Sequence, residues 1–271
     1  MNARRLAAPL AAALCALLFV APTAGAWAPA ASATVHPGVQ TFTDGAQCTA
    51  NFIFQDASNV YIGQAAHCSG TGGNTETNGC TSQSLPDGTP VDVTGASHPG
   101  VMVYNSWNAM QRVGEKNADI CQYNDIALIR LDPTDVAKTN PSIPFWGGPT
   151  GVNTTGTQSG DEVESYGNSE LRGGVSALSP KEGKSLGDGA NGWTRDVYTV
   201  TPGIPGDSGS AFIDAAGKAL GILSTVQIAP LAGSNGVGDV AKEVAYMQSH
   251  GGPAASVVNG TEAFTGPLSP V

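Results

Sequence analysis

The stretch Gly206-Asp207-Ser208-Gly209-Ser210 leads directly into two short apolar runs, at residues 211–213 and 219–223. The residues Asp214-Ala215-Ala216-Gly217 separate the two runs and have the composition of a tight turn. Short apolar runs on either side of such a turn are typical of a β-hairpin. We therefore predict antiparallel strands here, with a serine-containing loop at the entrance of the hairpin.

Short β-branched or aromatic runs bounded by Gly, Pro, Asn and Asp recur along the rest of the chain. They lie at residues 39–42, 49–54, 60–64, 91–94, 101–104, 126–131, 162–166 and 194–200. Helical periodicity is nearly absent before residue 236. Near the end, Asp239 is placed to cap a helix through about His250, with one apolar stripe formed by Val240, Val244 and Met247. The pattern favours an all-β barrel or sandwich followed by one short helix.

The composition limits the class of protein. The chain has 271 residues, and its 36 Gly show no triplet period, which excludes collagen. The net charge is −10 without clusters of Lys or Arg, so nucleic acid is excluded as a partner. Residues 132–144 contain three prolines and no alternation, and we take them as the connection between two halves, residues 34–135 and 136–250. Residues 251–271, rich in Gly, Pro, Ser and Ala, are expected to form a flexible tail.

The N-terminal residues have the pattern of a secretory signal peptide. Arg4 and Arg5 precede an apolar run at residues 6–20, and small residues suited to cleavage follow up to Ala33. The run is shorter than the roughly 20 residues that a membrane span needs. We therefore expect residues 1–33 to be removed, with the cut only approximately placed, and the protein to be secreted to the extracellular space.

The cysteine count supports export. Cys15 lies inside the signal peptide, which leaves Cys48, Cys68, Cys80 and Cys121. An even number in a secreted chain predicts two disulfides, and four cysteines allow three pairings. Because no C-x-x-C spacing occurs, a zinc site is a weak alternative, and we expect no metal and no other cofactor.

Three segments carry residue types that work together in nucleophilic catalysis. They are Ala65-Ala66-His67-Cys68, Asn124-Asp125-Ile126-Ala127-Leu128 and the stretch around Ser208. A serine hydroxyl needs an adjacent base near neutral pH, and His67 can supply it because imidazole titrates there. A buried carboxylate such as Asp125 would orient the imidazole and stabilise its charged form. Each segment alone is weak evidence, but their conjunction predicts a triad of His67, Asp125 and Ser208.

The turn at residues 206–208 supplies a second element of this chemistry. It would direct the backbone N–H groups of Gly206 and Ser208 toward one point, where they could stabilise an oxyanion by about 3–4 kcal/mol per donor. Glycine matters at position 206 because its N–H must point inward without a Cβ in the way. We expect these two groups to form an oxyanion hole.

In these motifs the chain resembles the trypsin/chymotrypsin-like serine peptidases. In its size and signal peptide it resembles the secreted bacterial, actinobacterial members of that family. The matching motifs are A-A-H-C at 65–68, N-D-I-A-L at 124–128 and G-D-S-G at 206–209. The resemblance implies two antiparallel six-stranded β-barrels, with His67 and Asp125 on the first, Ser208 on the second, and a short C-terminal helix. It also implies a serine endopeptidase with His67 as general base, Asp125 as orienting acid and Ser208 as nucleophile.

The same resemblance assigns further residues. Ser224 matches the serine that supports the buried aspartate, and residues 224–226 match the segment that binds substrate backbone as an added strand. In animal members a new N-terminal amine pairs with the acid before the nucleophile, here Asp207. A signal cut near Ala33 would bring the new terminus close to it, and Arg172 and Arg195 are rival partners. The implied disulfides pair Cys48 with Cys68 and leave Cys80 with Cys121.

The specificity pocket departs from that of trypsin. Its base, six residues before Ser208, is Pro202 rather than an acid, so a preference for Arg or Lys is not expected. Val226 stands where open-pocket members have Gly, and Thr225 stands where an aromatic residue is usual. We expect Pro202, Ser224, Thr225 and Val226 to bind substrate, with a preference for small or medium apolar side chains at the cleaved residue.

Other classes of function fit less well. An esterase or lipase on an α/β fold needs G-x-S-x-G, whereas position 210 is Ser, and its catalytic residues run in the order Ser, acid, His. A structural secreted β-protein would leave the three motifs as coincidence. The main alternative is a non-catalytic or latent protease-like binding protein on the same fold. As partners we expect protein or peptide substrates and proteinaceous inhibitors, with no nucleic acid and no membrane, and we expect a monomer.

Overall fold

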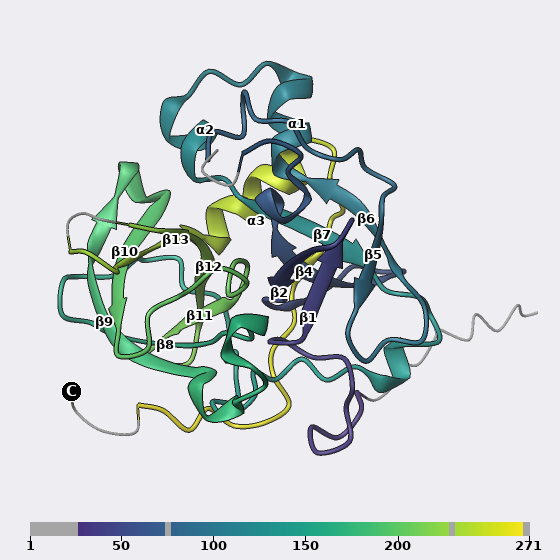
Figure 1. Ribbon diagram of the computed structural model, residues 1–271, viewed down its shortest axis with the longest axis vertical. Helices are drawn as coiled ribbons and strands as arrows, with labels where there is room; N and C mark the ends of the chain where they lie inside the picture. The colour runs from purple at the N-terminus through teal and green to yellow at the C-terminus, as the bar shows by residue number, and fades with distance from the viewer. Residues whose placement is uncertain (1–26, 74–76, 228–230, 268–271) are drawn as a thin grey trace, which may run out of the picture.

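The structure is a computed structural model that describes residues 27–73, 77–227 and 231–267. Most of the expected signal peptide, residues 1–26, lies outside the described residues. The described chain forms two β-structures that lie side by side, and a helix near the C-terminus packs beside both of them (Figure 1). The expected all-β class, with a short helix near the C-terminus, is confirmed.

The N-terminal half forms an antiparallel sheet that has eight strands among the described residues, in the order β14-β3-β4-β7-β6-β5-β1-β2. Residues 49–54, expected as one strand, divide between β2 and β3, and a strand from the C-terminal segment joins the edge, so the sheet exceeds the expected six strands. The strands are β1 (Gln40–Thr43), β2 (Ala46–Thr49), β3 (Ile53–Gln55), β4 (Val60–Ala65), β5 (Pro90–Val93), β6 (Gly100–Asn105), β7 (Ile126–Arg130) and β14 (Ser256–Val257).

The C-terminal half forms a closed barrel with the expected six strands among the described residues. They are β8 (Glu162–Tyr166), β9 (Pro180–Gly189), β10 (Thr194–Thr199), β11 (Ala211–Asp214), β12 (Ala219–Val226) and β13 (Asn235–Asp239). The predicted hairpin is β11 and β12, closed by a hydrogen bond from the Gly217 N–H to the Asp214 carbonyl at 2.7 Å. Buried apolar side chains form the barrel core: Val163, Val197, Phe212, Leu220, Leu223 and Val237.

Two strands of this barrel, β9 and β13, were not expected from the sequence. Strand β9 is rich in Gly and charged residues, and β13 consists mainly of Gly, Asn and Asp. These residues have low β-propensity, so pairing with neighbouring strands decides the conformation. Gly183 of β9 shows why glycine is required, because an added Cβ would collide with the Tyr198 carbonyl on β10. Small residues therefore mark close strand contacts here rather than turns.

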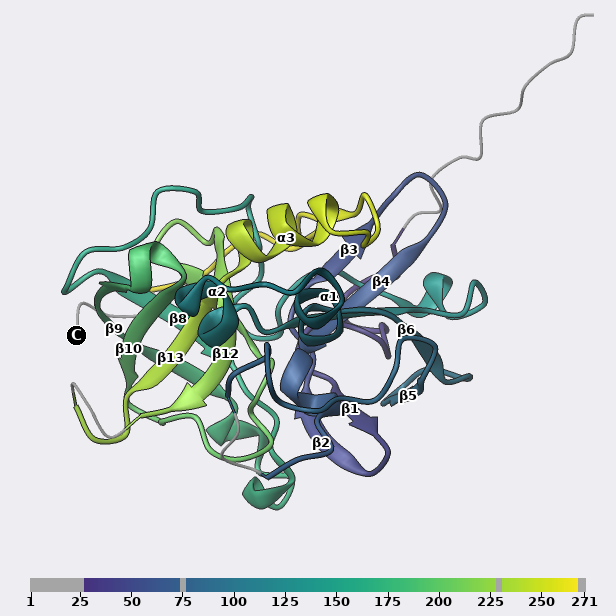
Figure 2. The ribbon, with the colours of Figure 1, turned by 90° about the horizontal axis from the view of Figure 1, so that it is seen from above.

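The expected C-terminal helix is α3 (Val240–Ser249), and the Asp239 carboxylate caps it by accepting the Lys242 N–H at 2.7 Å. Two short helices were not expected, α1 (Ser106–Val113) and α2 (Ala118–Tyr123). Figure 2 shows α3 lying across the junction of the two halves, with α1 and α2 beside it. No helix among the described residues is long and apolar enough to cross a bilayer.

The segment after α3 corrects an expectation. Residues 251–267 are not a loosely held tail, because β14 pairs with β3 and the following residues pack against the connection between the halves. The Gly148 N–H donates to the Glu262 carbonyl at 3.0 Å, and the Thr265 N–H donates to the Trp146 carbonyl at 2.8 Å. Phe264 also packs against a cluster of buried apolar residues that includes Ile143 and Trp146. The expectation from composition was wrong because backbone hydrogen bonds, which any residue type can form, hold this segment in place.

Candidate active site

His67 lies in a single turn, Ala66–Ser69, that directly follows β4. The disulfide between Cys48 and Cys68 ties this turn to β2, and a second one joins Cys80 to Cys121, so both implied pairings are confirmed. The Ala66 N–H donates to the Asp125 carbonyl at 2.9 Å. The sequence neighbours of His67 therefore fix its backbone against two other segments.

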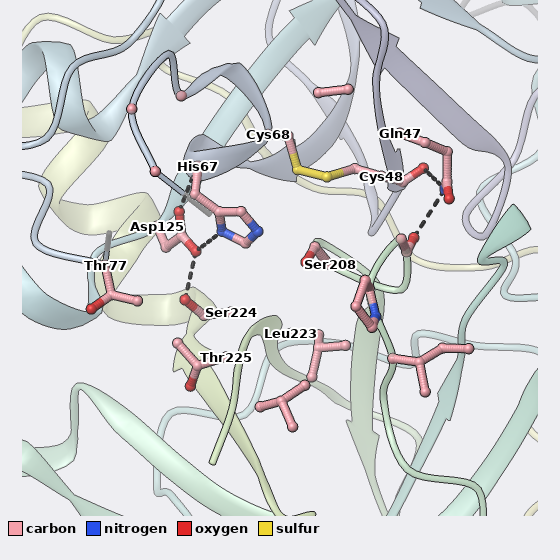
Figure 3. A pocket seen from close by; sticks show the side chains of 18 of the residues that line it. Gln47, Cys48, His67, Cys68, Thr77, Asp125, Ser208, Leu223, Ser224 and Thr225 are labelled. Atoms are coloured by element: carbon pink, nitrogen blue, oxygen red, sulfur yellow. Dashed lines mark hydrogen bonds and ion pairs between the residues drawn. A yellow bond between two sulfur atoms is a disulfide. The ribbon is translucent and has the colours of Figure 1, made fainter. Parts of the chain in front are cut away.

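Asp125 lies directly before β7, and its buried carboxylate receives three hydrogen bonds (Figure 3). Its Oδ1 accepts the backbone N–H of His67 at 2.9 Å, and its Oδ2 lies 2.7 Å from Nδ1 of His67. The Ser224 hydroxyl donates to Oδ2 at 2.5 Å. Ser224 thus contacts Asp125 directly, as its predicted supporting role requires. The three hydrogen bonds together hold the carboxylate in one orientation toward the imidazole.

Two opposing effects act on the pKa of His67. Burial favours the neutral imidazole and lowers the pKa, while the charge of Asp125 and its hydrogen bond favour the imidazolium. The carboxylate prevails, so the pKa lies above its ordinary value of 6.5. The imidazole is thus held in an orientation, and at a basicity, suited to taking up a proton.

Glu243 of α3 is a site residue that sequence reasoning missed. Its Oε1 accepts the backbone N–H of Asp125 at 2.8 Å, and the side chain is fully buried. Burial raises the pKa of this carboxyl well above its usual range, and the nearby charge of Asp125 acts in the same direction. Glu is common in the first turn of a helix because it interacts favourably with the helix dipole. Its presence at position 243 therefore gives no indication of a contact with Asp125.

Ser208 lies in the loop before β11 and faces the same cavity as His67 (Figure 3). The Thr49 N–H donates to the Ser208 carbonyl at 2.8 Å, which joins this loop to β2. Gly209 has a φ of +86°, and an added Cβ there would lie 2.6 Å from the Thr49 carbonyl oxygen. No hydrogen bond joins the Ser208 hydroxyl to His67 in the described part of the chain, where the bonded nitrogen of His67 is Nδ1.

The cavity between the two halves has a volume of about 580 Å³. Most of the residues predicted to form the site line it, whereas Pro202 does not. Its lining includes Gln47, Cys48, His67, Cys68, Trp107, Asp125, Ile204, Pro205, Gly206, Ser208, Leu223, Ser224, Thr225 and Val226. The structure thus brings together residues that lie far apart in the sequence.

The acid beside Ser208 is paired with two cations inside the protein. The fully buried carboxylate of Asp207 contacts the guanidinium of Arg172 and lies 2.9 Å from Nζ of Lys181. Arg195, the other candidate, pairs with Asp239 instead. Lys181 was missed because it lies on β9, a strand that the sequence did not indicate. Burial and the neighbouring Arg172 lower the pKa of Lys181, and Asp207 acts in the opposite direction.

The two segments that flank the predicted specificity pocket are joined by Asn235 of β13. The Gly203 N–H donates to Oδ1 of Asn235 at 2.9 Å, and Nδ2 of Asn235 donates to the Thr225 carbonyl at 3.3 Å. An added Cβ at Gly203 would lie 2.9 Å from the side chains of both Asn235 and Leu223. These two side chains therefore fill the space behind Gly203.

Residues 29–248 match the trypsin family, which covers well over half of the chain. A search of curated protein sequences finds no match.

Solved structures show the same fold at low sequence identity. Thermobifida fusca protease A is 14% identical with a TM-score of 0.53, and the match covers 83% of this chain and 99% of that one. Nocardiopsis protease is 16% identical with a TM-score of 0.51, covering 82% of this chain and 98% of that one. A Glu endopeptidase is 14% identical with a TM-score of 0.53, covering 83% and 94%. With the family match over residues 29–248, these observations show that the chain belongs to the trypsin family of serine endopeptidases.

Proposed function

We propose that this protein is an exported serine endopeptidase that cleaves peptide bonds through His67, Asp125 and Ser208. One observation carries the proposal: the buried carboxylate of Asp125 lies 2.7 Å from Nδ1 of His67, in a cavity that Ser208 also lines. An imidazole held in this way presents its other nitrogen, Nε2, as a base toward the cavity.

In the proposed mechanism the Ser208 hydroxyl attacks the carbonyl carbon of the scissile bond and its proton passes to Nε2 of His67. Asp125 stabilises the imidazolium that forms. The N–H groups of Gly206 and Ser208 donate to the oxyanion, and neither donates a hydrogen bond elsewhere among the described residues. His67 then gives its proton to the leaving amine, and a water molecule, activated in the same way, hydrolyses the acyl-enzyme.

Labelling of the active serine tests the proposal. The intact mass of the protein is measured before and after treatment with a fluorophosphonate, which reacts with activated serines. One adduct, mapped to Ser208, is the expected result. The absence of an adduct would support the alternative, a latent or non-catalytic binding protein on the same fold.

We propose a preference for small or medium apolar side chains at the cleaved residue. The cavity wall near Ser208 is apolar, formed by Ile204, Pro205, Leu223 and Val226. Asn235 and Leu223 fill the space behind Gly203, and neither Gly203 nor Asn235 lines the cavity, so we infer a shallow pocket. Apolar pockets discriminate by only about 1–3 kcal/mol per methylene, so the selectivity is expected to be broad.

Replacing Val226 by glycine is expected to shift this preference toward larger residues. Val226 is 56% exposed at the edge of the cavity, so its removal opens space with little loss of core packing. We expect the ratio of kcat/KM for phenylalanine over alanine substrates to rise by about tenfold or more. Peptide p-nitroanilides that differ only at the cleaved residue measure the ratio, with Val226→Ala expected to be intermediate. An unchanged ratio in both variants would refute this account of the pocket.

The pH dependence of kcat/KM is expected to follow His67. Only the neutral imidazole accepts a proton, so activity falls as the pH drops through its pKa. Because Asp125 raises that pKa, the midpoint of the acid limb should lie above 6.5. Rates between pH 5 and 9 test this, with His98→Asn as a control whose histidine lies at the surface, outside the cavity. A midpoint below 6.0, or a flat profile, would contradict the assignment of His67 as the base.

We further propose export with removal of the N-terminal segment close to Ala26. The two disulfides fit an oxidising compartment. Residues just after position 26 already belong to the fold: the Ala28 N–H donates to the Thr139 carbonyl at 3.0 Å, and Trp27 packs against the core of the N-terminal half. These contacts favour a cut earlier than Ala33, which the intact mass of the secreted protein measures.

A further inference from the structure

A side chain from another segment orients the peptide group between Pro205 and Gly206. The hydroxyl of Ser169 donates to the Pro205 carbonyl at 2.5 Å and accepts the Leu171 N–H at 3.1 Å. Ser169 is only 2% exposed, so water does not compete for these bonds. In a trans peptide the C=O and N–H groups point in opposite directions. With its carbonyl turned to Ser169, this peptide directs the Gly206 N–H away from Ser169.

We propose that Ser169 is a positioning residue that holds the oxyanion hole open by binding the Pro205 carbonyl. The inference rests on the proposed function, because it assigns the Gly206 N–H to the oxyanion. Ser169 is not among the residues that line the cavity, so its proposed effect is only through the orientation of one peptide group.

The alternative orientation of this peptide shows what Ser169 prevents. If the peptide turned over, the Pro205 carbonyl would face the cavity and present its lone pairs to the developing oxyanion. Gly206 offers little resistance to such a rotation, because its φ of +93° lies in a region where glycine moves freely. A carbonyl that lost its buried donor would gain by turning toward the open cavity, where water can reach it. The Ser169 hydroxyl therefore opposes a change that the local sequence permits.

The next peptide along the chain is held separately, from the N-terminal half. The Gly206 carbonyl accepts a hydrogen bond from Nε2 of Gln47 at 3.0 Å and one from the buried hydroxyl of Thr49 at 2.8 Å. These bonds fix the peptide group between Gly206 and Asp207. The preceding peptide group, between Pro205 and Gly206, is held by Ser169. The backbone of Ser169 is itself anchored, because its N–H donates to Oδ1 of Asp207 at 3.1 Å.

Kinetics of two variants at this position test the inference. Ser169→Ala removes the donor, and Ser169→Cys keeps a similar shape with a much weaker one. The matched control is Ser185→Ala, which removes a fully buried hydroxyl with two hydrogen bonds on β9, outside the cavity. For each protein we would measure kcat and KM on one peptide p-nitroanilide, together with the affinity for a trifluoromethyl ketone of the same peptide. That inhibitor forms a tetrahedral adduct whose oxyanion occupies the hole.

We expect kcat to fall by about 10- to 100-fold in Ser169→Ala and less in Ser169→Cys, with KM changed by no more than about twofold. The affinity for the ketone should fall by the same factor as kcat/KM. Ser185→Ala should change neither quantity, even where it lowers the melting temperature. If Ser169→Ala does not fold, the decrease in Ser169→Cys decides the question.

The outcomes separate this inference from the proposed function. A wild-type protein that neither cleaves peptides nor takes up the fluorophosphonate would overturn the proposed function, and the inference with it. An active wild type whose Ser169 variants keep kcat and ketone affinity within twofold would overturn the inference alone. A fall in kcat without a matching loss of ketone affinity would also overturn it, because the oxyanion hole would then be intact.

Discussion

Replacing Ser208 by alanine is expected to lower kcat by about 10⁴-fold or more while leaving the fold intact. The substitution removes the only atom that we assign to bond formation with substrate, whereas the oxyanion donors and the binding surface remain. Those remaining groups retain a small rate enhancement over water. Ser208 contributes no side-chain hydrogen bond among the described residues, and its backbone contact with Thr49 is unaffected by the change. Hydrolysis of a peptide p-nitroanilide by the purified protein measures the effect.

Ser210→Ala is the matched control for this prediction. Ser210 belongs to the same loop, is fully buried and has no hydrogen-bond partner for its hydroxyl among the described residues. Its replacement should leave kcat within about twofold of the wild type, so a shared loss would point to disturbance of the loop. A Ser208→Ala protein that kept more than a tenth of the wild-type rate would contradict the assignment of the nucleophile.

Local motifs account for what the sequence could predict. The residues flanking His67, Asp125 and Ser208 directly join strands or turns that the sequence also indicates, so each motif could be placed at a strand end. The hairpin at Asp214 and the cap at Asp239 depend on contacts within a few residues, and both were predicted correctly. The disulfide pairing followed from the family resemblance, because the cysteine count alone left three possibilities.

Contacts between distant segments account for what the sequence could not predict. Glu243 contacts Asp125 across 118 positions of sequence. Lys181 on β9 and Ser169 in the connection between β8 and β9 contact the loop before Ser208. Such residues carry no local pattern, because a buried Lys or Ser is recognisable only from its neighbours. Strand β9 was itself missed, since its sequence favours turns, and the contact of its Lys181 with Asp207 was missed with it.

Replacing Asp207 by asparagine is expected to cause a large loss of stability. The carboxylate of Asp207 has more positive than negative charge around it. Arg172 and Lys181 both contact it, with side chains that are 8% and 0% exposed. Replacement by asparagine would leave two buried cations without an anion. Removing one partner of a buried ion pair costs about 3–5 kcal/mol, most of which is the penalty for the charge left behind. We expect Asp207→Asn to lower the free energy of unfolding by an amount in this range, as measured by urea denaturation.

Two comparison variants show whether unpaired charge causes this loss. Lys181→Met should have a small effect, because burial and Arg172 already lower the pKa of the lysine and the pair of Arg172 with Asp207 remains. Adding Lys181→Met to Asp207→Asn should recover part of the lost stability, since it removes one of the two unpaired cations. Stability of Asp207→Asn within about 1 kcal/mol of the wild type would show that this cluster is not what holds the loop.

The same variant should lose activity as well as stability, because Asp207 connects the ion cluster to the backbone of the active loop. Its carboxylate accepts the N–H groups of Ser169 and Ile204, each at 3.1 Å, so its charge holds both flanks of the peptide that presents the Gly206 N–H. An asparagine has one carbonyl oxygen and cannot accept at both positions while also contacting two cations. We therefore expect kcat to fall more than tenfold under conditions where the variant remains folded. Full activity of folded Asp207→Asn would instead mean that Ser169, Gln47 and Thr49 hold the loop without the charge cluster beneath it.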